Sequence, residues 1–160
     1  MPAITAVLYT QNDALRLGRC LETLYPCDQI LVVDHGSRDE TVEVAREYGA
    51  QVVEAVPGAC PVHYLGTADP DWIFSLDPHE SVSESLAASL YEWKSRITDT
   101  ASTPAFSVFL REETAEGWLQ VPVAQTRLVP PAWKQWEGCF PSTAPSALAL
   151  EGELLRFVFP

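Results

Sequence analysis

The sequence predicts an α/β protein with a mostly parallel sheet flanked by helices, followed by an irregular β-rich C-terminal part. Three observations lead to this prediction. Apolar runs alternate with amphipathic helical patterns up to about residue 97, which is typical of parallel sheets. The runs are apolar almost throughout, as expected of strands that are buried on both faces. After residue 103 the chain changes to short strand-like runs that are broken by prolines.

The elements follow in order along the chain. The early strands are expected at residues 3–9, 29–33, 51–53 and 72–76. Helices are expected after the first, second and fourth of these, and the last two open with the capping boxes Ser37-x-x-Glu40 and Ser81-x-x-Glu84. Residues 57–70 are rich in Gly and Pro, which indicates a loop with one helical turn. The late strands are expected at residues 105–110, 118–128 and 154–159.

Length and composition limit the classes of function. The 160 residues correspond to one domain, and 47% hydrophobic with 20% charged residues is typical of a folded globular protein. A formal net charge of −12 argues against binding to nucleic acid, because phosphates would be repelled. We find no signal peptide and no transmembrane segment, so we expect a cytoplasmic protein with four reduced cysteines.

Two acidic residues come directly after apolar strands. Asp34 follows the second expected strand and Asp77 follows the fourth. In open α/β sheets, ligands bind beyond the carboxyl ends of the strands, where such a carboxylate can bind a ribose, a base or a divalent cation. The alternative is that each aspartate caps the turn that follows it. Spacing alone leaves both interpretations open.

Four segments resemble, in order, the pattern of family-2 glycosyltransferases, which have the GT-A fold. The segments are Tyr-Thr-Gln-Asn-Asp at 9–13, Cys-Leu-Glu-Thr-Leu at 20–24, Ile-Leu-Val-Val-Asp-His-Gly-Ser-Arg-Asp-Glu-Thr at 30–41 and Asp-Trp-Ile-Phe-Ser-Leu-Asp-Pro-His-Glu at 71–80. Gln-Thr-Arg-Leu at 125–128, Trp-Glu-Gly at 136–138 and the last strands at 148–159 resemble small bacterial transferases related to lipopolysaccharide-core glucosyltransferases, in a shortened form.

The resemblance implies a single GT-A-like domain over residues 1–160, with a nucleotide-sugar-binding half at 1–100 and a reduced acceptor half at 101–160. It implies an inverting, metal-dependent transfer of a sugar from a nucleoside-diphosphate sugar, with UDP as the expected nucleotide. The acceptor would be a saccharide or a lipid-linked molecule of the cell-envelope polysaccharide type. Mn²⁺ or Mg²⁺ would neutralise the leaving diphosphate.

The resemblance also implies roles for individual residues. Thr10 and Asp34 would contact the nucleotide base, and Asp77 would lie near the ribose and the metal-bound diphosphate. His79 stands where the family has the second acid of its metal motif, so Asp77 and His79 are the candidate metal ligands; a surface histidine is the alternative. Arg127 is the candidate for a phosphate contact, with an ordinary surface ion pair as the alternative.

The sequence departs from the family at two further positions. Residues 58–66 contain no Lys or Arg, so an expected cation for the diphosphate is missing, and His63 is its weaker substitute. Residues 139–142, Cys-Phe-Pro-Ser, replace the Val-His-Glu of the usual catalytic turn. The candidate replacements for the lost base are Glu112, Glu113 and Glu137, each of which could equally be a solvated surface residue.

Three hypotheses follow from these matches and departures. The first is an active glycosyltransferase, and the second is a catalytically degenerate homologue that acts as a nucleotide-binding or protein-interaction domain. The third, a phosphoacceptor receiver domain, is disfavoured because residues 9–12 offer no acid after the first strand. The short apolar late segments are also compatible with a homodimer.

Overall fold

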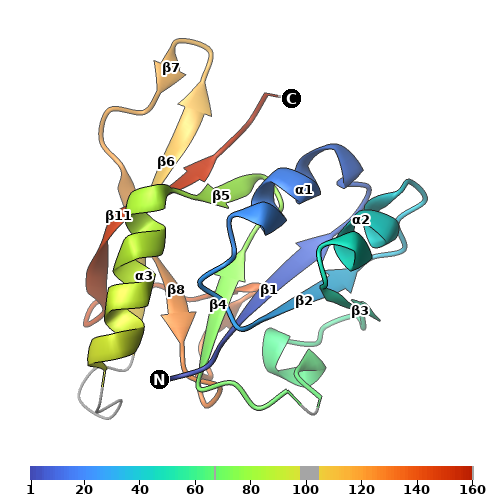
Figure 1. Ribbon diagram of the computed structural model, residues 1–160, viewed down its shortest axis with the longest axis horizontal. Helices are drawn as coiled ribbons and strands as arrows, with labels where there is room; N and C mark the ends of the chain where they lie inside the picture. Colours follow the sequence, from blue (N-terminus) through green and yellow to red (C-terminus); the bar gives the residue numbers. More distant parts are fainter. Residues whose placement is uncertain (67, 98–104, 160) are drawn as a thin grey trace.

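The computed structural model describes residues 1–66, 68–97 and 105–159. Within these residues, nine strands form one curled sheet with the order β3-β2-β1-β4-β8-β6-β11-β5, and β7 pairs with β6 (Figure 1). The predicted mixed α/β class is therefore confirmed, and strands from both ends of the chain join the same sheet. None of the helices in these ranges has the length and apolarity needed to span a membrane.

The first four strands of this sheet order run parallel. They are β1 (Ile4–Thr10), β2 (Gln29–Asp34), β3 (Gln51–Glu54) and β4 (Trp72–Leu76). Helix α1 (Ala14–Glu22) connects β1 to β2, and α2 (Thr41–Glu47) connects β2 to β3. The predicted helical turn in the following loop is η1 (Pro61–Tyr64). The strand order reverses between β1 and β4, which is the position where open α/β sheets bind their ligands.

The late strands extend the same sheet with mixed direction. They are β5 (Glu80–Val82), β6 (Phe106–Thr114), β7 (Gly117–Trp118), β8 (Val123–Val129) and β11 (Leu148–Arg156), with α3 (Glu84–Arg96) between β5 and β6. β8 pairs antiparallel with β4 and with β6, whereas β11 lies parallel to β6. A separate hairpin consists of β9 (Trp136–Glu137) and β10 (Phe140–Pro141).

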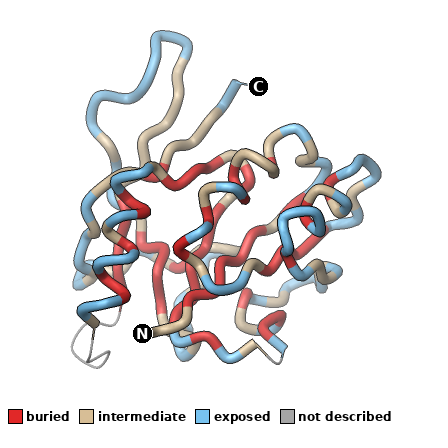
Figure 2. Tube along the Cα trace, viewed as in Figure 1, coloured by how far each residue is buried: buried red, intermediate tan, exposed pale blue. Residues whose placement is uncertain are grey.

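Two hydrophobic clusters lie on opposite faces of the sheet because side chains alternate along each strand. Figure 2 shows that buried residues follow the central strands of the sheet. Ile4, Ala6 and Leu8 of β1 face the cluster that includes α1, α2 and α3. Val7 of β1 points to the other face of the sheet. There it belongs to the cluster that includes Tyr64 of η1 and the segment that carries the β9–β10 hairpin. In the described residues the three α-helices thus share one face, while a single turn and irregular chain cover the other.

Both predicted capping boxes are wrong. The hydroxyl of Ser37 donates to the carboxylate of Asp34, 2.5 Å away, and α2 begins four residues later at Thr41. Ser81 lies within β5, and the residue that caps α3 is Ser83, whose hydroxyl accepts from the Leu86 amide at 3.2 Å. A Ser-x-x-Glu pattern cannot distinguish a helix cap from a strand residue when a strand runs directly into the helix.

Candidate functional site

Asp34 and Asp77 lie at the same edge of the sheet, on either side of β1. Asp34 ends β2 and pairs in register with Thr10, the last residue of β1. Asp77 directly follows Leu76, which pairs with Leu8 on the other side of β1. Two strand spacings separate β2 from β4, or about 10 Å. The edge defined by these strand ends is therefore the candidate site.

The carboxylate of Asp34 is held by its neighbours. It accepts hydrogen bonds from the Thr10 hydroxyl at 2.7 Å, the Ser37 hydroxyl at 2.5 Å and the Ser37 amide at 2.8 Å. Burial acts to raise the pKa of Asp34, but the hydrogen bonds from Ser37 and Thr10 outweigh it, so the pKa lies below its ordinary value. Asp34 is thus an ionised acceptor that is fixed by the strand beside it.

A cleft of about 480 Å³ opens beside these strand ends. We call it the strand-end cleft; it is lined by Tyr9, His35, Val56, Pro57, Gly58, Ala59, Cys60, Trp136, Gly138 and Cys139. The rings of Tyr9 and His35, which both line the cleft, lie 5.7 Å apart. Within the described residues, the buried hydroxyl of Tyr9 has no hydrogen-bond partner. Asp34 itself lines a neighbouring cavity of about 590 Å³ over β2 and β3, which shares His35 with the cleft.

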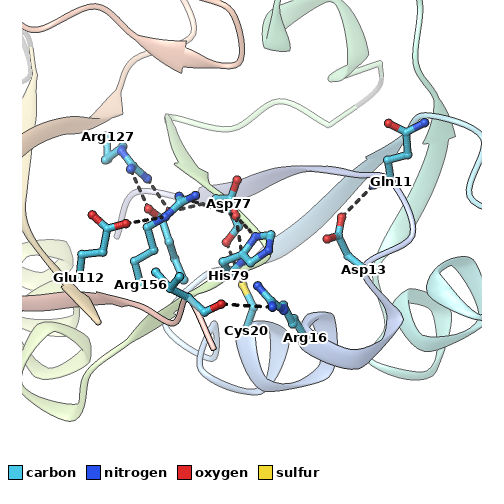
Figure 3. Close-up of polar contacts among 11 residues, drawn as sticks. Gln11, Asp13, Arg16, Cys20, Asp77, His79, Glu112, Arg127 and Arg156 are labelled. Carbon is cyan, nitrogen blue, oxygen red and sulfur yellow. Dashed lines mark hydrogen bonds and ion pairs between the residues drawn. The ribbon is translucent and has the colours of Figure 1, made fainter. Parts of the chain in front are cut away.

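Asp77 and His79 form a close pair in the loop between β4 and β5 (Figure 3). The Nδ1 atom of His79 is 2.5 Å from Oδ1 of Asp77, and about a quarter of each side chain is exposed (28% and 27%). The His79 amide also donates to this oxygen, at 2.9 Å. Among the residues that the structure describes, no group of three or more His, Cys, Asp or Glu is arranged to hold a metal. The candidate metal ligands are therefore one pair that is open to solvent.

Arg127 lies in the interior next to this loop. Its guanidinium binds Glu80 through two contacts of 2.7 and 2.9 Å, and both side chains are almost fully buried. It also donates to the carbonyl of Ser75 at 3.1 Å, and its charge lies over the ring of Phe140. The ion-pair alternative thus describes Arg127 in this structure, as a buried pair rather than a surface one. A phosphate contact by Arg127 stays a prediction.

The three candidate bases lie in different surroundings. Glu112 of β6 is 3.6 Å from the guanidinium of Arg156, which in turn is 3.9 Å from Asp77 (Figure 3). Glu113 accepts a hydrogen bond from the Phe159 amide at 2.9 Å, and Glu137 is exposed on β9. Among the described residues, Glu112 alone of the three is thus linked to Asp77, through its contact with Arg156.

Sequence reasoning missed two residues at this edge. Arg156 ends β11, far along the chain from Asp77, and only the sheet order brings the two together. Cys139 lines the strand-end cleft at the turn of the β9–β10 hairpin. Burial raises the pKa of Cys139. The turn lies close to the loop after β4, because the ring centre of the neighbouring Phe140 is 4.1 Å from the guanidinium carbon of Arg127, which binds Glu80. A weak signal was present, because Arg156 is the one charged residue among the apolar residues at 154–159.

Comparisons with known proteins find glycosyltransferases among the relatives of this chain. No protein-family model matches the chain. An uncharacterized glycosyltransferase of Rickettsia felis is 33% identical over 91 residues, which cover 54% of this chain and 32% of the relative. A TPR repeat-containing protein of Synechococcus elongatus is 32% identical over 130 residues, which cover 78% of this chain and 30% of the relative. The chain thus spans about a third of the length of these curated relatives.

A solved structure has the same fold. Glucosyl-3-phosphoglycerate synthase of Mycobacterium tuberculosis, in complex with Mn²⁺, UDP and glucosyl-3-phosphoglycerate, superposes with a TM-score of 0.52. The match covers 69% of this chain and 44% of that one at 17% identity, so it shows the fold alone. Together with the sequence relatives, this likeness agrees with the motifs at residues 9–13, 30–41 and 71–80. The chain is a homologue of the family-2-like glycosyltransferases and has the GT-A fold.

Proposed function

We propose that the chain binds a nucleoside-diphosphate sugar, with UDP as its nucleotide, and transfers the sugar with inversion to a saccharide or lipid-linked acceptor. The observation that supports this most directly is the position of Asp34 and of the Asp77–His79 pair at one edge of the sheet, on either side of β1. In this proposal residues 1–100 hold the nucleotide, and residues 101–160 complete the acceptor side.

The strand-end cleft suits a nucleoside. The Tyr9 and His35 rings offer apolar faces for a base or ribose, and the Tyr9 hydroxyl is a buried group without a partner among the described residues. Buried polar groups are nearly always hydrogen-bonded, so a ligand that forms a hydrogen bond with this hydroxyl would remove the free-energy cost of leaving it without a partner. Asp34 accepts from a base N–H in this proposal, and Thr10 orients its carboxylate.

The Asp77–His79 pair fits a divalent cation. A carboxylate oxygen and an imidazole nitrogen are both ligands for ions of the Mn²⁺ type, and both side chains are partly exposed. Two protein ligands suffice where phosphate oxygens and water complete the coordination, as is usual for nucleotide-bound Mg²⁺. Glu80 is not available as a further ligand, because Arg127 and the Asp77 amide occupy its oxygens. A bound cation would neutralise the charge that develops on the diphosphate.

Glu112 is our candidate for the general base, because it is the one of the three candidates that contacts Arg156, which in turn contacts Asp77. The acceptor hydroxyl attacks C1 of the sugar from the side opposite to the diphosphate and gives its proton to Glu112. The new C1–O bond forms as the bond from C1 to the diphosphate oxygen breaks. The bond electrons leave with the nucleoside diphosphate, and the configuration at C1 inverts.

Calorimetric titration with UDP, with and without Mn²⁺, tests the proposal. We expect binding that requires Mn²⁺ and that weakens in Asp34→Asn, Thr10→Val and Asp77→Asn. An Arg96→Gln variant is the control, because Arg96 is largely exposed and pairs with Glu92 at the end of α3. No binding heat with wild-type protein in either condition would contradict the proposed function.

A second candidate function is a nucleotide-binding or interaction domain without turnover. The residues of the β9–β10 turn favour it, because Gly138, Cys139 and Phe140 offer neither a carboxylate nor an imidazole. This candidate predicts UDP binding without release of sugar from UDP-glucose or UDP-galactose at any protein concentration. Turnover that disappears in Glu112→Gln while UDP binding persists would exclude it.

A further inference from the structure

Arg156 is fixed at the candidate site by the sheet rather than by a loop. In β11 it pairs in register with Glu112 of β6 on one side and with Glu80 of β5 on the other. The next amide, of Phe157, donates to the carbonyl of His79 at 2.8 Å. The backbone of Arg156 is therefore held between the two strands that carry the candidate base and the loop of the candidate metal ligands.

The chain beyond Arg156 is also anchored. The guanidinium of Arg19, in α1, lies 3.9 Å from the centre of the Phe157 ring, and the ring of Trp118 contacts the same phenylalanine edge-on. Arg16 donates to the carbonyl of Val158 at 3.3 Å (Figure 3). Together with the strand pairing of residues 154–156, these contacts fix the main chain on both sides of Arg156, so its side chain projects from a defined position.

The guanidinium of Arg156 is not saturated by its carboxylate neighbours. It is 3.9 Å from Oδ1 of Asp77 and 3.6 Å from Oε1 of Glu112, and 34% of the side chain is exposed. Both distances exceed those of hydrogen bonds. By contrast, Arg127 and Arg111 each hold one carboxylate through two contacts of 2.7 and 2.9 Å. Arg156 therefore keeps donors that a further anion can use.

We propose that Arg156 binds the diphosphate of the nucleotide and that, without nucleotide, it neutralises Asp77. This inference rests on the proposed function. Residues 58–66 contain no Lys or Arg, so the loop after β3 supplies no cation for a diphosphate. A planar guanidinium with free donors, next to the candidate metal ligands, is suited to phosphate oxygens. The last strand thus supplies the charge that the loop lacks.

Two opposite consequences follow for ligand binding. Without nucleotide, the positive charge of Arg156 repels a divalent cation that approaches Asp77 and competes for its oxygen. With nucleotide, the guanidinium turns to the phosphates and strengthens the complex. Removal of the charge should therefore strengthen the binding of Mn²⁺ alone and weaken the binding of UDP in the presence of Mn²⁺. A purely structural residue would weaken both.

The experiment compares wild type with Arg156→Gln and Arg156→Lys. Arg96→Gln serves as the matched control, since Arg96 is a largely exposed arginine that pairs with Glu92 at the end of α3. Mn²⁺ alone, UDP with saturating Mn²⁺, and uridine are titrated into each protein. We expect Arg156→Gln to bind UDP about ten- to a hundredfold more weakly, Mn²⁺ more tightly and uridine as wild type does. The lysine variant keeps the charge and should fall between the two for UDP.

Three outcomes would overturn the inference. UDP affinity that is unchanged in Arg156→Gln would show that the guanidinium does not meet the diphosphate. Equal weakening of Mn²⁺, UDP and uridine, in both the glutamine and the lysine variant, would show a structural role. Either of these two results, obtained with a wild type that binds UDP, would leave the proposed function standing without the inference. If wild type binds neither UDP nor Mn²⁺, the proposed function is wrong, and this inference, which rests on it, is wrong as well.

Discussion

Arg127 and Glu80 form a two-contact ion pair inside the protein, with Nη1 2.7 Å from Oε1 and Nη2 2.9 Å from Oε2. Glu80 also accepts from the amide of Asp77 at 2.8 Å. The pair therefore joins β8 to the loop that carries the candidate metal ligands. Its two side chains lie where the parallel part of the sheet meets the antiparallel part.

The Arg127–Glu80 pair should be important for stability. Arg127→Met leaves the carboxylate of Glu80 buried without its partner, which costs about 3–5 kcal/mol. Unfolding in urea measures the loss. Arg111→Met is the control, because its partner Glu153 is partly exposed, and we expect a smaller loss there. The double variant Arg127→Met/Glu80→Leu should recover much of the stability; equal losses in the Arg127 and Arg111 variants would contradict this account.

The low pKa of Asp34 predicts a specific pH dependence. Burial raises this pKa, but the hydrogen bonds from Ser37 and Thr10 lower it by more than burial raises it. The pKa in the folded protein therefore lies below the ~3.9 of an unfolded aspartate. The stabilisation is then complete above the unfolded value and is lost as the pH falls through the folded value. Urea unfolding from about pH 6 to about pH 3 should show that the advantage of wild type over Asp34→Asn shrinks. Glu47→Gln, on an exposed position of α2, should show no such trend.

The Asp77–His79 pair predicts how Mn²⁺ affinity can be changed. His79→Asp replaces the imidazole by a carboxylate, which is the ligand that hard divalent cations prefer, so Mn²⁺ should bind more tightly. His79→Ala and Asp77→Asn should bind it more weakly. The electron paramagnetic resonance signal of free Mn²⁺ reports the bound fraction. His63→Ala should bind Mn²⁺ as tightly as wild type does. Equal changes of Mn²⁺ affinity in the His63 and His79 variants would contradict the proposed metal site.

Gly152 should be intolerant of substitution. Its φ is +97°, and an added Cβ would lie 2.3 Å from the backbone nitrogen of Leu86, at the start of α3. Gly138 has a φ of +64° but no atom within 4 Å of such a Cβ. Gly138→Ala should therefore cost about 1–3 kcal/mol from backbone strain alone, and Gly152→Ala distinctly more. Thermal unfolding of both variants measures which loses more stability. Similar losses would show that the backbone near Leu86 moves to make room for the added Cβ, against this prediction.

The cysteines report both on burial and on the strand-end cleft. Burial raises the pKa of Cys27 to about 12 and holds the pKa of Cys20 far above its ordinary value. Cys27 is only half-buried and should react slowly with a thiol reagent, whereas the fully buried Cys20 should not react in the folded protein. Cys60 is exposed and lines the strand-end cleft. It should react first, and UDP with Mn²⁺ should slow its reaction. Cys60→Ser removes this fast phase, whereas fast labelling of Cys20 in native protein would contradict the fold.

Local pattern was sufficient for the early elements. Apolar runs at residues 29–33 and 72–76 are too short and too continuous for helices, so two strands, each followed by an aspartate, could be predicted, and they correspond to β2 and β4. The motif at residues 30–41 then indicated the family. Helix starts were predicted less well, since Ser37 and Ser81 have the residue type of a cap but bind elsewhere or lie in a strand.

The sequence by itself determined that β2 and β4 end in acids at a common edge, because parallel strands align their carboxyl ends. Only the tertiary structure decided which late residues join that edge. Arg156 and Asp77 are separated by most of the second half of the chain, and their contact depends on the pairing of β11 with β5 and β6. Such non-local pairing leaves no periodic signal in the sequence, since it depends on how the whole sheet is ordered.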